Sequence, residues 1–179
     1  MVSQGAHSMV ERMIGASRLD IHIFEEVESD TSATRQALSV VFLAALATGI
    51  ASMGIVGLLG LLIGVVVAVA GWAIWAWIVY FIGTKILPGH ETHADWGQLA
   101  RSLGFAQSPG VLRVFGVVPG VGGIIFLVVS VWMLVSMVIA VRQALDYTST
   151  LRAIGVVLLG FIPYVILASI ALTILGPTV

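Results

Sequence analysis

The chain contains one long stretch without charge, and this stretch restricts its fold more than any other feature. Between Arg35 and Lys85 no residue is charged. A helix needs about 20 mostly apolar residues to cross the hydrocarbon core of a bilayer. The stretch is more than twice that long, so it predicts two membrane-spanning helices joined by a tight turn near Gly54, Gly57 and Gly60. A soluble domain would not readily bury helices of this length and apolarity.

Composition agrees with an all-α, polytopic membrane helical bundle. The 179 residues are 59% hydrophobic and 9% charged, whereas an average soluble domain has about 25% charged residues. The net charge of -1 gives no field that would attract nucleic acid, so nucleic acid is not an expected partner. Cysteine is absent, which excludes disulfides and thiolate chemistry.

Hydrophobic segments and turn residues predict a transmembrane domain over 36–179 with five spans. The expected spans cover about 36–53, 61–87, 96–118, 124–141 and 153–175. Asp95 and Gln98 have the spacing of a capping box at the start of the third span. Pro109 lacks a backbone N–H, so we expect it to kink this span. The same span carries Gln107 and Arg113.

Residues 1–35 form a polar N-terminal tail with the pattern of an amphipathic helix, broken at Gly15. Its apolar face consists of Met9, Met13, Ala16, Ile23, Phe24 and Val27. We expect this face, with Phe24 as a contact residue, to dock on the chain's own bundle or on a partner. A position in the lipid interface is the alternative, but the opposite face is acidic, whereas interfacial helices are usually basic.

The positions of Lys and Arg predict the orientation in the membrane. With five spans, all of the eight basic residues except Arg113 lie on one side. This places the N-terminus in the cytoplasm and the C-terminus outside a multi-pass protein of the cell inner (plasma) membrane. A four-span alternative, with 96–118 as a re-entrant or surface hairpin, would place Arg142 and Arg152 outside.

Residues with metal-ligand chemistry gather in one loop only, and they are weak candidates. His90 and His93 are three residues apart, which is not the spacing of the H-E-x-x-H zinc motif. A solvated loop followed by a helix cap explains the segment more simply. No catalytic triad or phosphate-binding loop is visible, and no histidine lies inside an expected span. We therefore expect no catalytic residues, no metal and no cofactor.

Arg113 is the one charged residue expected within the membrane away from the cytoplasmic side. A charge at mid-membrane costs at least about 2.5–3.5 kcal/mol on insertion scales. Arg113 therefore either extends outward to the interface or turns inward. An inward Arg113 would bind Gln107, or carbonyls freed by Pro109, and staple the helix or line a polar pocket. Because the acidic residues of the loops lie on the cytoplasmic side, an anionic lipid headgroup or a carbonyl cluster is a better partner than a carboxylate.

Several short motifs resemble the bacterial branch of the Yip-one domain family, small five-span membrane proteins named for eukaryotic Ypt/Rab-interacting members. The similar segments are Arg18-Leu19-Asp20 with Phe24, Trp96-Gly97-Gln98-Leu99, Leu103-Gly104-Phe105-Ala106-Gln107-Ser108-Pro109, Pro119, Trp132 and Val141-Arg142-Gln143-Ala144-Leu145, ending at Ala153. The resemblance implies a five-span fold and a membrane location, and no established reaction. The DLYGP-type motif of the eukaryotic members is missing, so Rab binding is not carried over.

Two functions remain open on the sequence alone. The first is a non-enzymatic membrane protein that organises membrane lipid, partner proteins or copies of itself, including a role as accessory subunit of a larger complex. It rests on small-residue helices, short loops and the lack of a catalytic set. The second is a small oligomeric transporter or channel that uses Arg113, Gln107 and the break at Pro109.

Overall fold

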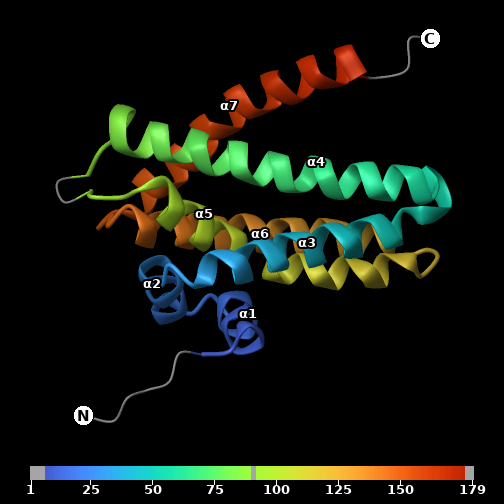
Figure 1. The fold of residues 1–179 in the computed structure, drawn as a ribbon, viewed down its shortest axis with the longest axis horizontal. Coiled ribbons are helices and arrows are strands. Elements are labelled where there is room, and N and C mark those ends of the chain that lie inside the picture. The colour runs from blue at the N-terminus through green and yellow to red at the C-terminus, as the bar shows by residue number, and fades with distance from the viewer. Residues whose placement is uncertain (1–6, 90–91, 176–179) are drawn as a thin grey trace.

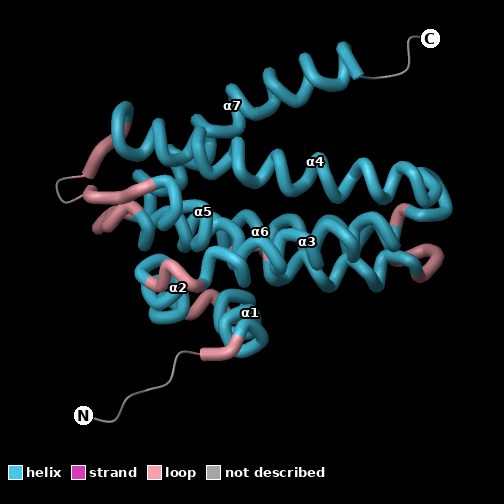
Figure 2. The backbone as a smooth tube through the Cα atoms, in the orientation of Figure 1, coloured by secondary structure: helices cyan, strands magenta, loops and turns pink. Residues whose placement is uncertain are grey.

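The computed structural model describes residues 7–89 and 92–175, and every regular element in these ranges is a helix (Figures 1 and 2). The elements are α1 (Met9–Ser17), α2 (Ile21–Ser29), α3 (Ala33–Ala51), α4 (Met53–Phe81), the π-helix η1 (Ile82–Ile86), α5 (Trp96–Phe105), the 3₁₀ helix η2 (Ser108–Val117), α6 (Gly122–Ala144) and α7 (Thr150–Leu175). The expected all-α bundle is confirmed.

Four helices in the described part of the chain are long and apolar enough to cross a membrane. They are α3, α4 together with η1, α6, and α7. Each overlaps one of the expected spans. The segment expected to form the third span, 96–118, is not among them, because it is divided into an α-helix and a 3₁₀ helix of ten residues each.

The turn between the first two long helices runs from Ser52 to Gly57, so it begins slightly before the expected glycines and includes Gly54 and Gly57. Helix α3 ends at Ala51, and α4 begins at Met53 with a short first segment before its backbone leaves helical geometry at Gly57. Gly57 lies inside α4 with φ 66°, in the left-handed region that glycine adopts without steric cost. The glycine therefore marks a kink in α4, and Gly60 continues the helix.

Pro109 breaks the third segment, where the sequence predicted a single kinked helix. In a continuous α-helix its backbone nitrogen would bind the carbonyl of Phe105, but proline has no N–H to donate. The α-helix α5 ends at Phe105, and the Ser108 hydroxyl donates to the Phe105 carbonyl at 2.6 Å. The chain then continues as η2, an unusually long 3₁₀ helix.

Small residues allow this broken segment to lie directly against α3. A Cβ atom at Gly104 would lie 2.8 Å from the Cβ of Ala37, and one at Gly110 would lie 3.0 Å from that of Ala44. Helix backbones in membranes approach closely at such positions. The segment is thus built into the bundle, with α3 on one side and α6 on another.

The long helices define two ends of the bundle, and α7 leaves it. In Figure 1 the α3–α4 turn and the turn between η2 and α6 lie at one end, while the loop before α5 and the α6–α7 connection lie at the other. Near its start, α7 buries Ala153, Val156 and Val157. It contains Pro163 and diverges from α4 toward its C-terminal end (Figure 1).

Candidate functional site

The N-terminal tail folds as a helical hairpin, α1 and α2, that docks on the bundle. Phe24 is 0% exposed and belongs to the core of the bundle together with Ala16, Ile23 and Val27. This confirms docking on the chain's own bundle. The break between the two helices lies at residues 18–20, not at Gly15. Gly15 instead permits the helices to cross closely, since a Cβ atom there would lie 2.5 Å from Ile23.

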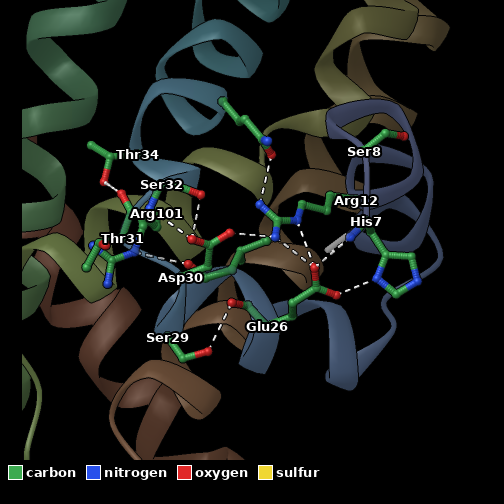
Figure 3. A network of polar contacts seen from close by, with 12 residues as sticks. His7, Ser8, Arg12, Glu26, Ser29, Asp30, Thr31, Ser32, Thr34 and Arg101 are labelled. Atoms are coloured by element: carbon green, nitrogen blue, oxygen red, sulfur yellow. Dashed lines mark hydrogen bonds and ion pairs between the residues drawn. The ribbon is translucent and has the colours of Figure 1, made fainter. Parts of the chain in front are cut away.

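Arg12 joins the hairpin to α3 through a buried polar network (Figure 3). The side chain is 1% exposed. Its Nε and one terminal nitrogen donate to Glu26 Oε1 at 2.9 and 2.8 Å, and the same terminal nitrogen donates to Asp30 at 2.6 Å. The other terminal nitrogen donates to Gln36 on α3 at 2.9 Å. Charge-assisted bonds of this kind are the strong ones in proteins, so Arg12 determines how α1, α2 and α3 meet.

The carboxylates of this network are held in their charged form. Hydrogen bonds from Ser32 and then from Arg12 lower the pKa of Asp30 to about 2. Burial raises the pKa of Glu26, but hydrogen bonds from Arg12 and His7 outweigh burial, so the pKa is lowered overall. Both groups therefore stay ionised at neutral pH and keep Arg12 paired.

Two further side chains fix the ends of the hairpin helices. Arg101 of α5 is 5% exposed, and its Nε donates to the carbonyls of Val27 and Glu28 at 3.0 and 3.1 Å. A second bond runs from its terminal nitrogen to Glu28. A cation at a helix C-terminus binds orphan carbonyls and complements the helix dipole. At the end of α1, Trp132 of α6 donates to the Ser17 carbonyl at 2.8 Å.

Glu28 lies beside Arg101 in an acidic environment. Gln98 donates to its carboxylate at 3.2 Å. Burial and, to a smaller extent, the negative charge of Asp146 raise the pKa of Glu28, Arg101 opposes the shift, and the resulting pKa is about 7. Ionisation of Glu28 therefore takes place near neutral pH, at the contact between α2 and α5.

Arg113 faces α6 at the other end of the bundle. A terminal nitrogen donates to the Ser130 hydroxyl at 2.8 Å, and the guanidinium carbon lies 5.4 Å from the centre of the Phe126 ring. Its Nε is excluded from solvent and has no hydrogen-bond partner among the described residues. The Phe105 carbonyl freed by Pro109 binds Ser108 and not Arg113, so that part of the expectation for an inward Arg113 is wrong.

Two adjoining cavities meet at Arg113, with volumes of about 280 and 360 Å³. Both are lined by Ala68, Gln107, Arg113 and Met133. The first extends along α3 and α4 past Thr48, Ser52 and Gly60. The second extends to the aromatic side chains of Trp72, Trp75, Phe161 and Tyr164. The structure thus brings Gln107 and Arg113 together at one pocket with mainly apolar walls, while Pro109 breaks the helix beside it without lining either cavity.

A third cavity of about 350 Å³ lies between α4 and α7 and is entirely apolar. It is lined by Trp77, Ile78, Phe81, Ile82, Ile86, Leu159, Ile162 and Pro163. We call it the α4–α7 groove. Its wall on α7 includes Pro163, the proline inside that helix.

The loop with metal-ligand residue types provides no built site within the described chain. His93 is exposed, and His90 lies outside the described residues. Among the residues that the structure describes, no three His, Cys, Asp or Glu side chains are grouped to hold a metal ion. The capping box is confirmed, with reciprocal bonds of 2.8 and 2.7 Å between Asp95 and Gln98.

Sequence reasoning missed Arg12 and Arg101 as the residues that hold the hairpin. A signal for Arg12 existed, because it precedes the buried Ala16 by four residues and therefore shares its helix face. Arg101 follows the buried Leu99 and Ala100 within a short amphipathic helix. Only the docked hairpin shows that its target is the end of α2.

Fold and composition define a polytopic helical membrane protein. A family model described as "Yip1 domain" matches residues 22–170, from the start of α2 into α7. The match covers most of the chain, so this protein belongs to the Yip1 domain family. No curated protein and no solved structure gives a significant match.

Proposed function

We propose that this protein is a non-enzymatic membrane protein that organises membrane lipid or partner proteins, including a role as accessory subunit of a larger complex. The α4–α7 groove is the observation that supports it most. A groove with only apolar walls between two membrane helices suits a helix or acyl chain, because association in lipid depends on close packing. It offers no polar group that would orient a substrate.

The contacts of the two most buried arginines support the same proposal. Arg12 binds two carboxylates and an amide, and Arg101 binds two backbone carbonyls. Each group has an acceptor within the chain and a role in joining helices. Such groups stabilise contacts between elements and are not poised for reaction.

We further propose five crossings of the inner membrane, with the N-terminus in the cytoplasm and the C-terminus outside. The ten residues of α5 and the ten of η2 extend about 15 and 20 Å at the rises of α and 3₁₀ helices. Together they reach about 35 Å, enough for a hydrocarbon core of about 30 Å. Reporter fusions at the two termini test this topology. Two cytoplasmic termini would contradict it.

Photo-crosslinking in native membranes tests the groove. A photoreactive residue at Leu159, in the groove, is expected to crosslink one partner reproducibly. The same residue at Val131, exposed on α6, is expected not to do so. Ile162→Trp should fill the groove and abolish the crosslink, whereas Leu151→Trp, on an exposed position outside it, should leave the crosslink intact. Equal crosslinking at both positions, or none, would contradict the proposal.

One observation favours a second candidate function, a small oligomeric transporter or channel. The helix break beside Gln107 and the cavities at Arg113 resemble the way broken helices line polar sites in transporters. Solute flux through purified protein in liposomes, lost in Arg113→Leu, would support this candidate. Liposomes that stay tight would reject it.

A further inference from the structure

We propose that the two cavities at Arg113 form a binding site for the phosphate headgroup of an anionic membrane lipid. The proposal goes beyond the α4–α7 groove and depends on different residues. It assigns a ligand class to the pocket that η2 builds with α3, α4, α6 and α7.

The first argument is charge. In the described part of the chain, every ion pair lies within the α1–α2 hairpin. Within 7–89 and 92–175, Arg113 has a serine hydroxyl and an aromatic ring as its contacts and no carboxylate. A guanidinium cannot lose its proton in a protein, and an unpaired charge away from water is costly. An anion is therefore the group that the site requires.

The second argument is the pattern of donors. Arg113 Nε and Trp75 Nε1 are both buried, and neither has a hydrogen-bond partner among the described residues. Both side chains line the larger cavity, and Trp75 is 6% exposed. Indole and guanidinium nitrogens only donate hydrogen bonds. A ligand with several acceptor oxygens, as a phosphate has, would satisfy both groups at once.

The third argument is shape. The two cavities share the walls at Ala68, Gln107 and Met133 and continue one another past Arg113. One arm carries Thr48 and Ser52, and the other is walled by aromatic rings. Ligand sites commonly combine mainly apolar walls with a few convergent polar groups. Two mainly apolar arms on either side of one cationic side chain suit an amphiphile better than a free ion.

Native mass spectrometry of the full-length protein tests the site. The protein is released from detergent micelles that contain phosphatidylcholine and an equal amount of phosphatidylglycerol with the same acyl chains. Wild type should retain one phosphatidylglycerol molecule at least about tenfold better than phosphatidylcholine, because both lipids carry the phosphate but the choline cation of phosphatidylcholine cancels the net negative charge that Arg113 requires. Equal retention of the two lipids would overturn the proposal.

Variants locate the site. Arg113→Leu should remove the preference for phosphatidylglycerol. Arg113→Lys should keep part of it, because lysine has the charge but not the planar set of N–H donors. Trp75→Phe should weaken the preference about threefold, because one hydrogen bond is lost. Arg35→Leu, which removes an exposed arginine outside the cavities, should leave it unchanged. A preference that survives Arg113→Leu would overturn the proposal. If Arg113→Leu does not fold, Arg113→Lys and Trp75→Phe decide, and unchanged retention in both would also overturn it.

A competition experiment with water-soluble phosphates distinguishes a lipid ligand from free phosphate, which has the same acceptor oxygens. Inorganic phosphate and glycerol phosphate at millimolar concentration should neither bind nor displace phosphatidylglycerol. Displacement by either would show that the pocket takes a free anion, and would overturn the assignment to lipid. Crosslinking in the α4–α7 groove does not depend on these results, so the two proposals fail separately.

Discussion

The arginines of the hairpin and the arginine of η2 have the same side chain in opposite situations. Arg12 and Arg101 are buried, and carboxylates or carbonyls of the chain satisfy them. Arg113 contacts the Ser130 hydroxyl and the Phe126 ring, and its Nε has no hydrogen-bond partner among the described residues. Where the chain supplies the acceptors, arginine stabilises the fold. Where the described chain provides no acceptor, as at the Nε of Arg113, arginine can bind a ligand.

The largest expected effect comes from Arg12. Arg12→Met should leave Glu26 and Asp30 without their cation, and breaking a buried ion pair costs about 3–5 kcal/mol. The hairpin should undock, seen as faster hydrogen exchange of the α2 amides. Arg18→Met, at an exposed position between the two helices, is the matched control. Protection of α2 that stays equal in both variants would show that Arg12 does not hold the hairpin.

Phe24 tests the apolar side of the same contact. Phe24→Asp removes a fully buried ring and buries a carboxylate, at a combined cost of about 3 kcal/mol or more. Proteolysis within residues 18–20 should accelerate. Val10→Asp, at an exposed position on α1, should have little effect. Equal cleavage of Phe24→Asp and wild type would mean that Phe24 does not anchor the hairpin.

The sequence predicts those parts of this molecule that depend on local patterns. The charge-free stretch indicates membrane helices, the Asp95–Gln98 spacing indicates a helix start, and the apolar face of the tail identifies Phe24 as buried. These features follow from the periodicity of hydrophobic residues and from the chemistry of helix caps, and residues close together in the sequence determine both.

The rest depends on contacts between distant residues. Arg101 binds carbonyls more than 70 positions away in the chain, and no local pattern encodes that pairing. Pro109 signals a disturbance, but the length of the 3₁₀ helix after it depends on packing between α3 and α6. The pairing of Arg113 with Ser130 likewise requires the η2–α6 turn to bring two helices together.

Arg101 should show a smaller effect than Arg12. Arg101→Lys keeps the charge but loses the planar fork that reaches two carbonyls, so we expect a loss of about 1–2 kcal/mol in hairpin docking. Hydrogen exchange of the last turn of α2 measures it. Arg35→Lys is the control, because Arg35 is exposed. If Arg101→Lys weakened docking as much as Arg12→Met, docking would depend on the planar guanidinium of Arg101 more than on its positive charge.

Glu28 should give the smallest effect, a pH dependence of docking. Its pKa is raised from 4.5 to about 7, mainly by burial, so the docked state binds more protons than the undocked one between these values. The contribution of Glu28 to docking is then fully present below about pH 4.5 and is lost as pH rises through about 7. Proteolysis of the hairpin should accelerate over this window in wild type and stay constant in Glu28→Gln. A slope that persists in Glu28→Gln would assign it to another group.

Thermal unfolding in nanodiscs tests most directly whether Arg113 is a binding residue and Arg101 a structural one. In phosphatidylcholine alone, Arg101→Leu should melt below wild type, whereas Arg113→Leu should melt close to it. Added phosphatidylglycerol should raise the Tm of wild type and of Arg101→Leu, because a ligand stabilises the state that binds it, and should leave Arg113→Leu unchanged. The contradicting result is an Arg113→Leu protein that melts as low as Arg101→Leu in phosphatidylcholine and is partly rescued by Arg113→Lys. Arg113 would then be a structural staple and not a binding residue.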